Sequence, residues 1–166
     1  MQFEVGDFVV HPVYGLGQIV EIEERQFSGK EACLYYQIDL SRRTVWIPVE
    51  AEGDSTLRTV TAESELDRYR ELLASRPVPL LKNHHQRHRE LLTRLRQGSF
   101  QTACEVVRDL TAWGWRKPLG PTDMATLQKT LESLYQEWAV AAGVSRSEAI
   151  KEIDSLLRTT RQAALG

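Results

Sequence analysis

Apolar and polar residues alternate along the first 50 positions of the chain, which is the pattern of strands that bury one face. Residues 32–40 place four apolar side chains on a common face: Leu34, Tyr36, Ile38 and Leu40. Residues 18–25 set Val20 and Ile22 opposite Glu21 and Glu23. In residues 44–50, the side chains of Val45, Ile47 and Val49 share one face, and those of Thr44 and Trp46 lie on the other. These segments therefore predict strands with one face turned toward a core.

Short breaks separate the alternating segments. They lie at residues 12–17, which contain Pro12 and the sequence Tyr-Gly-Leu-Gly, at 28–30 and at 41–43. Breaks of a few residues are typical of hairpins, so neighbouring strands should be antiparallel. About five such strands are expected to curl into a small antiparallel barrel over residues 1–55, with Pro48 at a strand end or a sheet edge.

From about residue 61 the hydrophobic period becomes helical. Thr61 is suited to cap a first helix, and Glu63 and Glu65 in the first turn of that helix are favourable at the positive end of its dipole. That helix must end before Pro77 and Pro79, which cannot continue it.

Three further helix starts carry capping residues. Asn83, with Gln86 three residues later, predicts a helix that runs to Gly98. Ser99 predicts another through residue 113, and residues 114–123 break it. A fourth helix is expected at 122–142, and Ser145 begins the last one. Residues 61–166 are thus predicted to form an all-helical domain of about five helices, which makes the whole chain an α+β fold.

The net charge of −2 hides an uneven distribution. Residues 1–54 hold four basic and ten acidic side chains, whereas residues 76–96 hold six basic side chains and one acidic one. Such asymmetry indicates two surfaces with different partners. The two cysteines, Cys33 and Cys104, are interpreted as reduced packing residues. Without a long apolar run or an N-terminal signal pattern, the chain is expected to stay in the cytoplasm.

The segment KNHHQRHRE at 82–90 holds three of the four histidines. On a helix capped by Asn83, one stripe would contain His84, His88, Leu91, Leu92 and Leu95, with arginines at 87, 89, 94 and 96 on its flanks. Free backbone N–H groups at a helix start attract phosphate. A basic helix of this kind suits contact with a nucleic-acid backbone, although a solvated basic helix has the same pattern.

Metal binding and catalysis by these histidines are weaker hypotheses. His84 and His88 have the spacing that can chelate zinc, but His85 stands where a metalloprotease motif has glutamate, and no third ligand is evident nearby. No nucleophile or carboxylate partner appears at a recognisable spacing either. The sequence therefore predicts no catalytic residue and no metal site.

Residues 3–25, FEVGDFVVHPVYGLGQIVEIEER, closely resemble the start of the CarD/CdnL family of bacterial transcription regulators. Residues 45–50, VWIPVE, fit the family's final barrel strand, and residues 91–110, LLTRLRQGSFQTACEVVRDL, fit its helical part. The resemblance covers nearly the whole chain. The transcription-repair coupling factor shares the N-terminal motif, but a helical C-terminal part without helicase motifs favours the CarD-like branch.

This resemblance implies a Tudor-like N-terminal domain that binds the RNA polymerase β subunit. It also implies a helical domain that reaches promoter DNA at the upstream edge of the bubble. Such a protein would be a nucleoid-associated monomer without enzymatic activity or cofactor that modulates the stability of the open complex. By alignment, the polymerase contact falls on Arg25, Phe27 and Trp46. The basic pattern of residues 82–89, taken together with this resemblance, assigns the DNA contact to Lys82, His84, Arg87, His88 and Arg89.

One position departs from the family. Alignment places His84 where the family has a tryptophan that wedges into the minor groove at the bubble edge. Base–aromatic stacking contributes about 1–3 kcal/mol, and a histidine is expected to keep part of it. We therefore expect DNA contact with weaker bubble stabilisation. Two rival hypotheses stay open: an adaptor that binds polymerase without touching DNA, and an enzyme built on His84 and His88.

Overall fold

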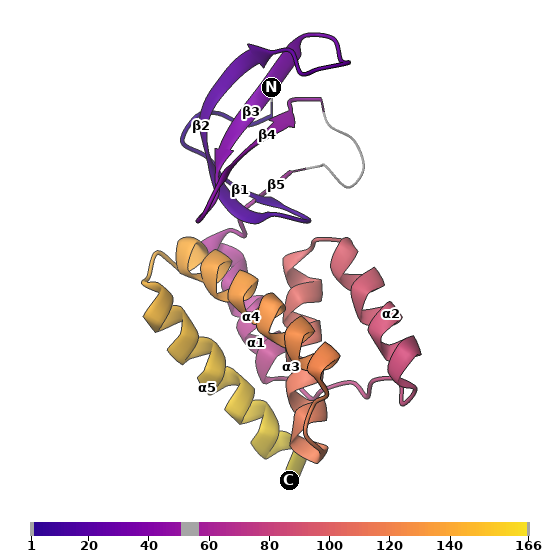
Figure 1. Cartoon of the computed structure of the whole chain (residues 1–166). Helices are drawn as coiled ribbons and strands as arrows, with labels where there is room; N and C mark the ends of the chain where they lie inside the picture. The colour runs from indigo at the N-terminus through magenta and orange to yellow at the C-terminus, as the bar shows by residue number, and fades with distance from the viewer. Residues whose placement is uncertain (1, 51–56, 166) are drawn as a thin grey trace. The chain divides into compact units, whose positions relative to one another are not determined.

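The computed structural model describes residues 2–50 and 57–165 of the chain. The chain divides into two compact units, Met1–Val60 and Thr61–Gly166. The first holds an antiparallel sheet and the second is helical (Figure 1), which confirms the predicted α+β fold class. The predicted end of the first domain, residue 55, lies outside the described residues, and the first unit includes a short strand beyond it.

Five strands form the sheet: β1 (Phe8–His11), β2 (Gly15–Arg25), β3 (Cys33–Asp39), β4 (Thr44–Pro48) and β5 (Arg58–Thr59). Their order is β4-β3-β2-β1-β5, and each pairing is antiparallel. The predicted antiparallel neighbours are therefore confirmed. Pro48 ends the edge strand β4, where its missing N–H is tolerated. The described pairings give an open order of strands, and closure into a barrel stays a prediction.

A β-bulge in β2 changes which residues face the core. Ile19 pairs with Ile38 and Glu21 pairs with Gln37, so the register shifts between them. Ile19 is fully buried whereas Val20 is exposed, which corrects the prediction that Val20 lies on the inner face. An extra residue in one strand interrupts the alternation once. The residues that follow the bulge are thereby placed on the faces that the sequence pattern predicts for them.

The core of the first unit depends on a close approach of β2 to β3. A Cβ atom at Gly17 would lie 2.5 Å from Cγ2 of Ile38, so a side chain there would force the two strands apart. The buried side chains of this core come from most of its strands and from both flanking segments: Phe3, Val9, Ile19, Tyr36, Ile38, Ile47 and Leu57.

His11 closes the turn between β1 and β2. Its Nδ1 accepts hydrogen bonds from the backbone N–H groups of Val13 at 3.0 Å and Tyr14 at 3.2 Å. The imidazole also packs against the Tyr14 ring, with 4.7 Å between the ring centroids. Burial lowers the pKa of His11, in keeping with a neutral ring whose Nδ1 carries no proton.

The second unit contains a short 3-10 helix, η2 (Glu63–Glu65), and five α-helices. These are α1 (Leu66–Ala74), α2 (His84–Arg96), α3 (Phe100–Arg116), α4 (Pro121–Ala142) and α5 (Arg146–Leu165). None of the helices in the described part of the chain is long and apolar enough to cross a membrane.

Three predicted caps are present. Oδ1 of Asn83 accepts from the N–H of Gln86 at 3.0 Å, and Oγ of Ser99 accepts from the N–H of Thr102 at 3.0 Å. At the last helix, Oγ of Ser145 accepts from the N–H of Glu148 at 3.1 Å. Each bond satisfies one backbone donor that the first turn of a helix leaves without a partner.

Two helix boundaries differ from the predictions. Thr61 does not cap the first helix, because its N–H and its hydroxyl both donate to Oε2 of Glu137, at 3.0 and 2.8 Å. α3 continues past Gly114 to Arg116. Leu119 packs against Gly114, where an added Cβ would lie 3.3 Å from its Cγ. The first difference comes from a contact with a residue 76 positions away in the chain.

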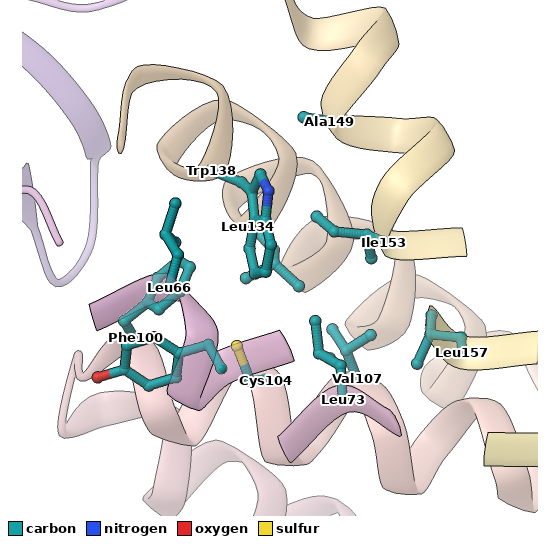
Figure 2. Packing of buried hydrophobic residues seen from close by; sticks show 11 residues of the cluster. Leu66, Leu73, Phe100, Cys104, Val107, Leu134, Trp138, Ala149, Ile153 and Leu157 are labelled. Atoms are coloured by element: carbon teal, nitrogen blue, oxygen red, sulfur yellow. The ribbon is translucent and has the colours of Figure 1, made fainter. Parts of the chain in front are cut away.

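The main core of the helical unit surrounds the indole of Trp138, as Figure 2 shows. Side chains from α1, α3, α4 and α5 meet there, and the indole Nε1 donates to Oε1 of Glu152 at 2.8 Å. Cys104 belongs to this cluster, and burial raises the pKa of its thiol. Cys33 is exposed, so the packing role predicted for both cysteines holds for Cys104 alone.

A second cluster fixes α2 against α3. It contains Leu80, Leu91, Val106 and Leu110. Leu91 is fully buried, but Leu92 is 38% exposed, which corrects the prediction that both leucines share the inner stripe. The inner side of α2 passes through Arg87 and Leu91, one turn apart.

Acidification should destabilise the protein through His11. Because its pKa in the folded state lies below 6.5, the unfolded chain binds this proton more readily. The stabilisation is therefore complete above about pH 6.5 and is lost as the pH falls through the folded pKa, with a slope of at most about 1.4 kcal/mol per pH unit. Urea unfolding between pH 7 and 5 measures it. His11→Asn should flatten the dependence, and an equal slope in both proteins would contradict the assignment.

Leu91→Ala and Leu92→Ala form a matched pair on α2. Loss of the buried side chain should lower the free energy of unfolding by about 2–5 kcal/mol, because it removes apolar burial and leaves a cavity. Loss of the exposed one should change it by less than about 1 kcal/mol. Chemical denaturation of both variants tests the placement, and similar losses would contradict it.

Candidate functional site

Arg25, Phe27 and Trp46 lie together at one face of the sheet. The guanidinium carbon of Arg25 is 4.6 Å from the centroid of the Trp46 ring. The Phe27 centroid is 6.4 Å from that of Trp46 and 5.0 Å from that of Tyr35. The structure therefore brings the three residues predicted for the polymerase contact into one cluster, which we call the aromatic–arginine cluster, with Tyr35 as a fourth member.

Strand register places Arg25 on β2 and Trp46 on β4 at the same face of the sheet, on either side of β3. Arg25 pairs with Cys33 on β3, and Gln37 on β3 pairs with Trp46 on β4. Residues that pair across adjacent strands point to the same face, so Arg25 and Trp46 lie on the face that Cys33 and Gln37 share. Tyr35 lies between Cys33 and Gln37 on that face, so the alternation pattern could have identified it as a member of the cluster.

Charge and exposure make this cluster suitable for binding another protein. The Arg25 side chain is 42% exposed, and its Nε lies 2.5 Å from Oε1 of Glu23. An arginine over an indole face contributes roughly 0.5–2 kcal/mol, depending on its desolvation. Arginine, tryptophan and tyrosine are also the residues most enriched in binding hot spots.

The start of α2 presents the second group of candidate residues. Lys82, His84, His85 and Arg89 are exposed, and the rings of the first two histidines lie 5.3 Å apart. His88 is half-buried, and its Nδ1 has no hydrogen-bond partner among the described residues. Three of the five residues predicted for DNA contact are therefore exposed, one just before this helix and two in its first half.

Arg87 is placed differently from its prediction. It does not lie on a solvent-exposed flank but is buried, and its Nε and Nη2 donate to Oδ2 of Asp123 at 3.1 and 2.8 Å. Its Nη1 donates to the carbonyl oxygens of Leu81 and Lys82, both at 3.1 Å. The Trp113 ring centroid lies 5.1 Å from its guanidinium carbon. In this arrangement the side chain holds the helix start and is not free to meet a ligand.

Among the residues that the structure describes, no three side chains of histidine, cysteine, aspartate or glutamate are grouped to hold a metal ion. His84 and His88 face different surroundings, because His84 is exposed at the first turn and His88 is half-buried.

Both units match known domain families. Residues 3–61 match the CarD-like/TRCF RID domain, and residues 69–154 match the CarD C-terminal domain. The chain belongs to the CarD-like family. It is also similar to the putative transcription factor YdeB of Bacillus subtilis (strain 168), with 30% identity over 147 residues that cover 88% of this chain and 96% of that protein.

Membership in the CarD-like family confirms the resemblance drawn from the sequence. It indicates a transcription-related protein of an RNA polymerase-interacting type, and this family is one of transcription factors and not of enzymes. The roles of individual residues in the aromatic–arginine cluster and on α2 stay predictions.

Proposed function

We propose that this protein regulates transcription initiation by binding the RNA polymerase β subunit and touching promoter DNA at the upstream edge of the bubble. The aromatic–arginine cluster would bind the polymerase, and the exposed start of α2 would contact the DNA. The observation that carries the proposal is the convergence of Arg25, Phe27 and Trp46 on one sheet face of a CarD-like/TRCF RID domain.

The chemistry of the cluster supports a protein partner. A guanidinium can stack on an indole and still has five N–H donors, of which the Arg25 Nε donates to Glu23, so the remaining donors can meet carboxylates or carbonyls of a partner. Phe27, 37% exposed, adds apolar surface beside that charge. An exposed aromatic residue next to an arginine is the composition of an interface anchor.

The start of α2 supports a contact with a nucleic-acid backbone. Lys82 and Arg89 supply positive charge, and His84 is the first residue of the helix. Phosphate is favoured at this end because the first N–H groups point outward and the helix dipole is positive there. Here Lys82, His84, His88 and Arg89 would contact promoter DNA, backbone first, and the bubble would be stabilised less than by the family's tryptophan.

One observation favours the rival adaptor hypothesis. Arg87 was included in the basic surface predicted for residues 82–89, but it is buried. Fewer permanent positive charges therefore face solvent at this helix start. An adaptor would bind polymerase through the sheet and leave DNA untouched. The two functions differ in whether charge changes on α2 alter transcription.

Charge reversal in Arg25→Glu should weaken binding to an isolated β-subunit fragment by about 30-fold or more, because a hot-spot side chain contributes 2 kcal/mol or more. Arg43→Glu is a matched control. Arg43 also packs over an aromatic ring of the same unit, at 4.6 Å from the Tyr14 centroid, but lies outside the cluster. Calorimetry on both variants measures the effect, and equal affinities would contradict the assigned surface.

The lifetime of the polymerase–promoter open complex should depend on the ring at position 84. His84→Trp should lengthen it and His84→Ala should shorten it, each by up to about tenfold, since stacking on a base contributes about 1–3 kcal/mol. His85→Ala, the exposed neighbour, is the control and should change the lifetime little. Unchanged lifetimes in all variants, with polymerase binding intact, would favour the adaptor.

A further inference from the structure

We propose that Arg87 is a positioning residue for the DNA contact: it does not meet DNA, but it fixes residues 81–84 so that Lys82 and His84 are held ready for it. This inference rests on the proposed function. It assigns to Arg87 a role opposite to the one that its place in a basic sequence segment suggests.

The hydrogen bonds of Arg87 connect two distant parts of the helical unit. On one side its Nε and Nη2 donate to Oδ2 of Asp123, 36 residues away in the first turn of α4. On the other side its Nη1 donates to the carbonyl oxygens of Leu81 and Lys82. A single planar side chain therefore ties the segment before α2 to the start of α4.

The carbonyls of Leu81 and Lys82 belong to the non-helical segment that precedes the cap residue Asn83. Lys82 and His84 flank that cap, so a bond to the backbone at 82 constrains the direction of both exposed side chains. Fixing groups in their bound arrangement before binding lowers the entropy that binding would otherwise cost.

The surroundings of Arg87 make the role specific for arginine. The side chains of Arg87 and Asp123 are 8% and 2% exposed, and the guanidinium lies over the Trp113 ring. Among the described residues, Oδ1 of Asp123 has no partner, so the carboxylate depends on Arg87 for compensation. Lysine is a point charge without the planar set of donors, and it could not serve both carbonyls and the carboxylate together.

Asp123→Asn separates positioning from direct contact by the sign of its effect. If Arg87 met phosphate, removing a nearby negative charge would leave DNA binding unchanged or strengthen it. If Arg87 positions the segment, weakening its anchor should lower affinity, by about tenfold if the competent arrangement falls to a tenth of the population. Fluorescence anisotropy with a duplex that carries a short unpaired bubble measures this at several salt concentrations.

The salt dependence of the same titrations compares two neighbouring arginines. Arg89→Ala should reduce the slope of log K against log salt by about 0.9, as expected when one phosphate contact is lost. Arg87→Met should weaken binding with the slope unchanged. A reduced slope in Arg87→Met together with unchanged or tighter binding in Asp123→Asn would overturn the proposal.

A double variant distinguishes positioning from a general loss of stability. Replacing a buried ion pair by apolar side chains is often neutral for folding, so Arg87→Met/Asp123→Leu should regain the stability that Arg87→Met loses. Its affinity for the bubble duplex should stay low, because the carbonyls of Leu81 and Lys82 still lack their donor. Recovery of affinity along with stability would assign Arg87 a merely structural role.

Amide hydrogen exchange in the free protein tests the positioning role of Arg87 separately from the proposed DNA contact. Exchange at residues 82–85 should be faster in Arg87→Met and in the double variant than in wild type, and unchanged in Arg89→Ala. If wild type does not bind the bubble duplex, the DNA part of the proposed function fails, and with it the role in DNA contact. Unchanged exchange at 82–85 in Arg87→Met would overturn the proposal by itself.

Discussion

The buried pair of Arg87 and Asp123 is the constraint on which the arrangement of the helical unit's exposed end depends. A charged pair is taken out of water at a high desolvation cost, and removing one partner of such a pair costs about 3–5 kcal/mol. Because the guanidinium also binds two carbonyls ahead of α2, the same interaction that compensates Asp123 sets the course of the chain at 81–83. Stability and the geometry of the exposed basic residues are therefore coupled through one side chain.

A comparable arrangement exists in the sheet. The outer face carries an arginine whose charge is shared between Glu23 and the face of Trp46, and Phe27 and Tyr35 complete the apolar surroundings. In both units an arginine packs against an indole. The two arginines differ in burial: Arg25 is accessible to a partner, whereas Arg87 is buried and makes internal contacts. Residue type alone does not identify which arginine contributes to a binding surface.

Several features followed from local sequence. Alternation predicted the inner faces of β4 and of most of β3, but Leu34, predicted on the inner face of β3, is 44% exposed. Asn83, Ser99 and Ser145 marked helix starts, because a cap acts within three residues of itself. The family resemblance assigned Arg25, Phe27 and Trp46 to one surface, and in the structure their side chains lie close together. The predicted faces and caps held because each depends on neighbours in sequence or on the regular spacing of antiparallel strands.

What the tertiary structure decided involves partners far away in the chain. The bulge at Ile19 to Glu21 leaves Val20 exposed. The Thr61 hydroxyl does not cap a helix but donates a hydrogen bond to Glu137, 76 residues away. The sequence predicts Arg87 to be an exposed cation, because the residues that bury and compensate it are not its neighbours in the chain. The carboxylate of Asp123 is 36 residues away, and the ring that packs against the guanidinium belongs to Trp113. The sequence by itself determined which segments are strands and helices, the caps at Asn83, Ser99 and Ser145, and most of the buried faces. Burial of individual charges was decided by packing, because it depends on which distant groups compensate them.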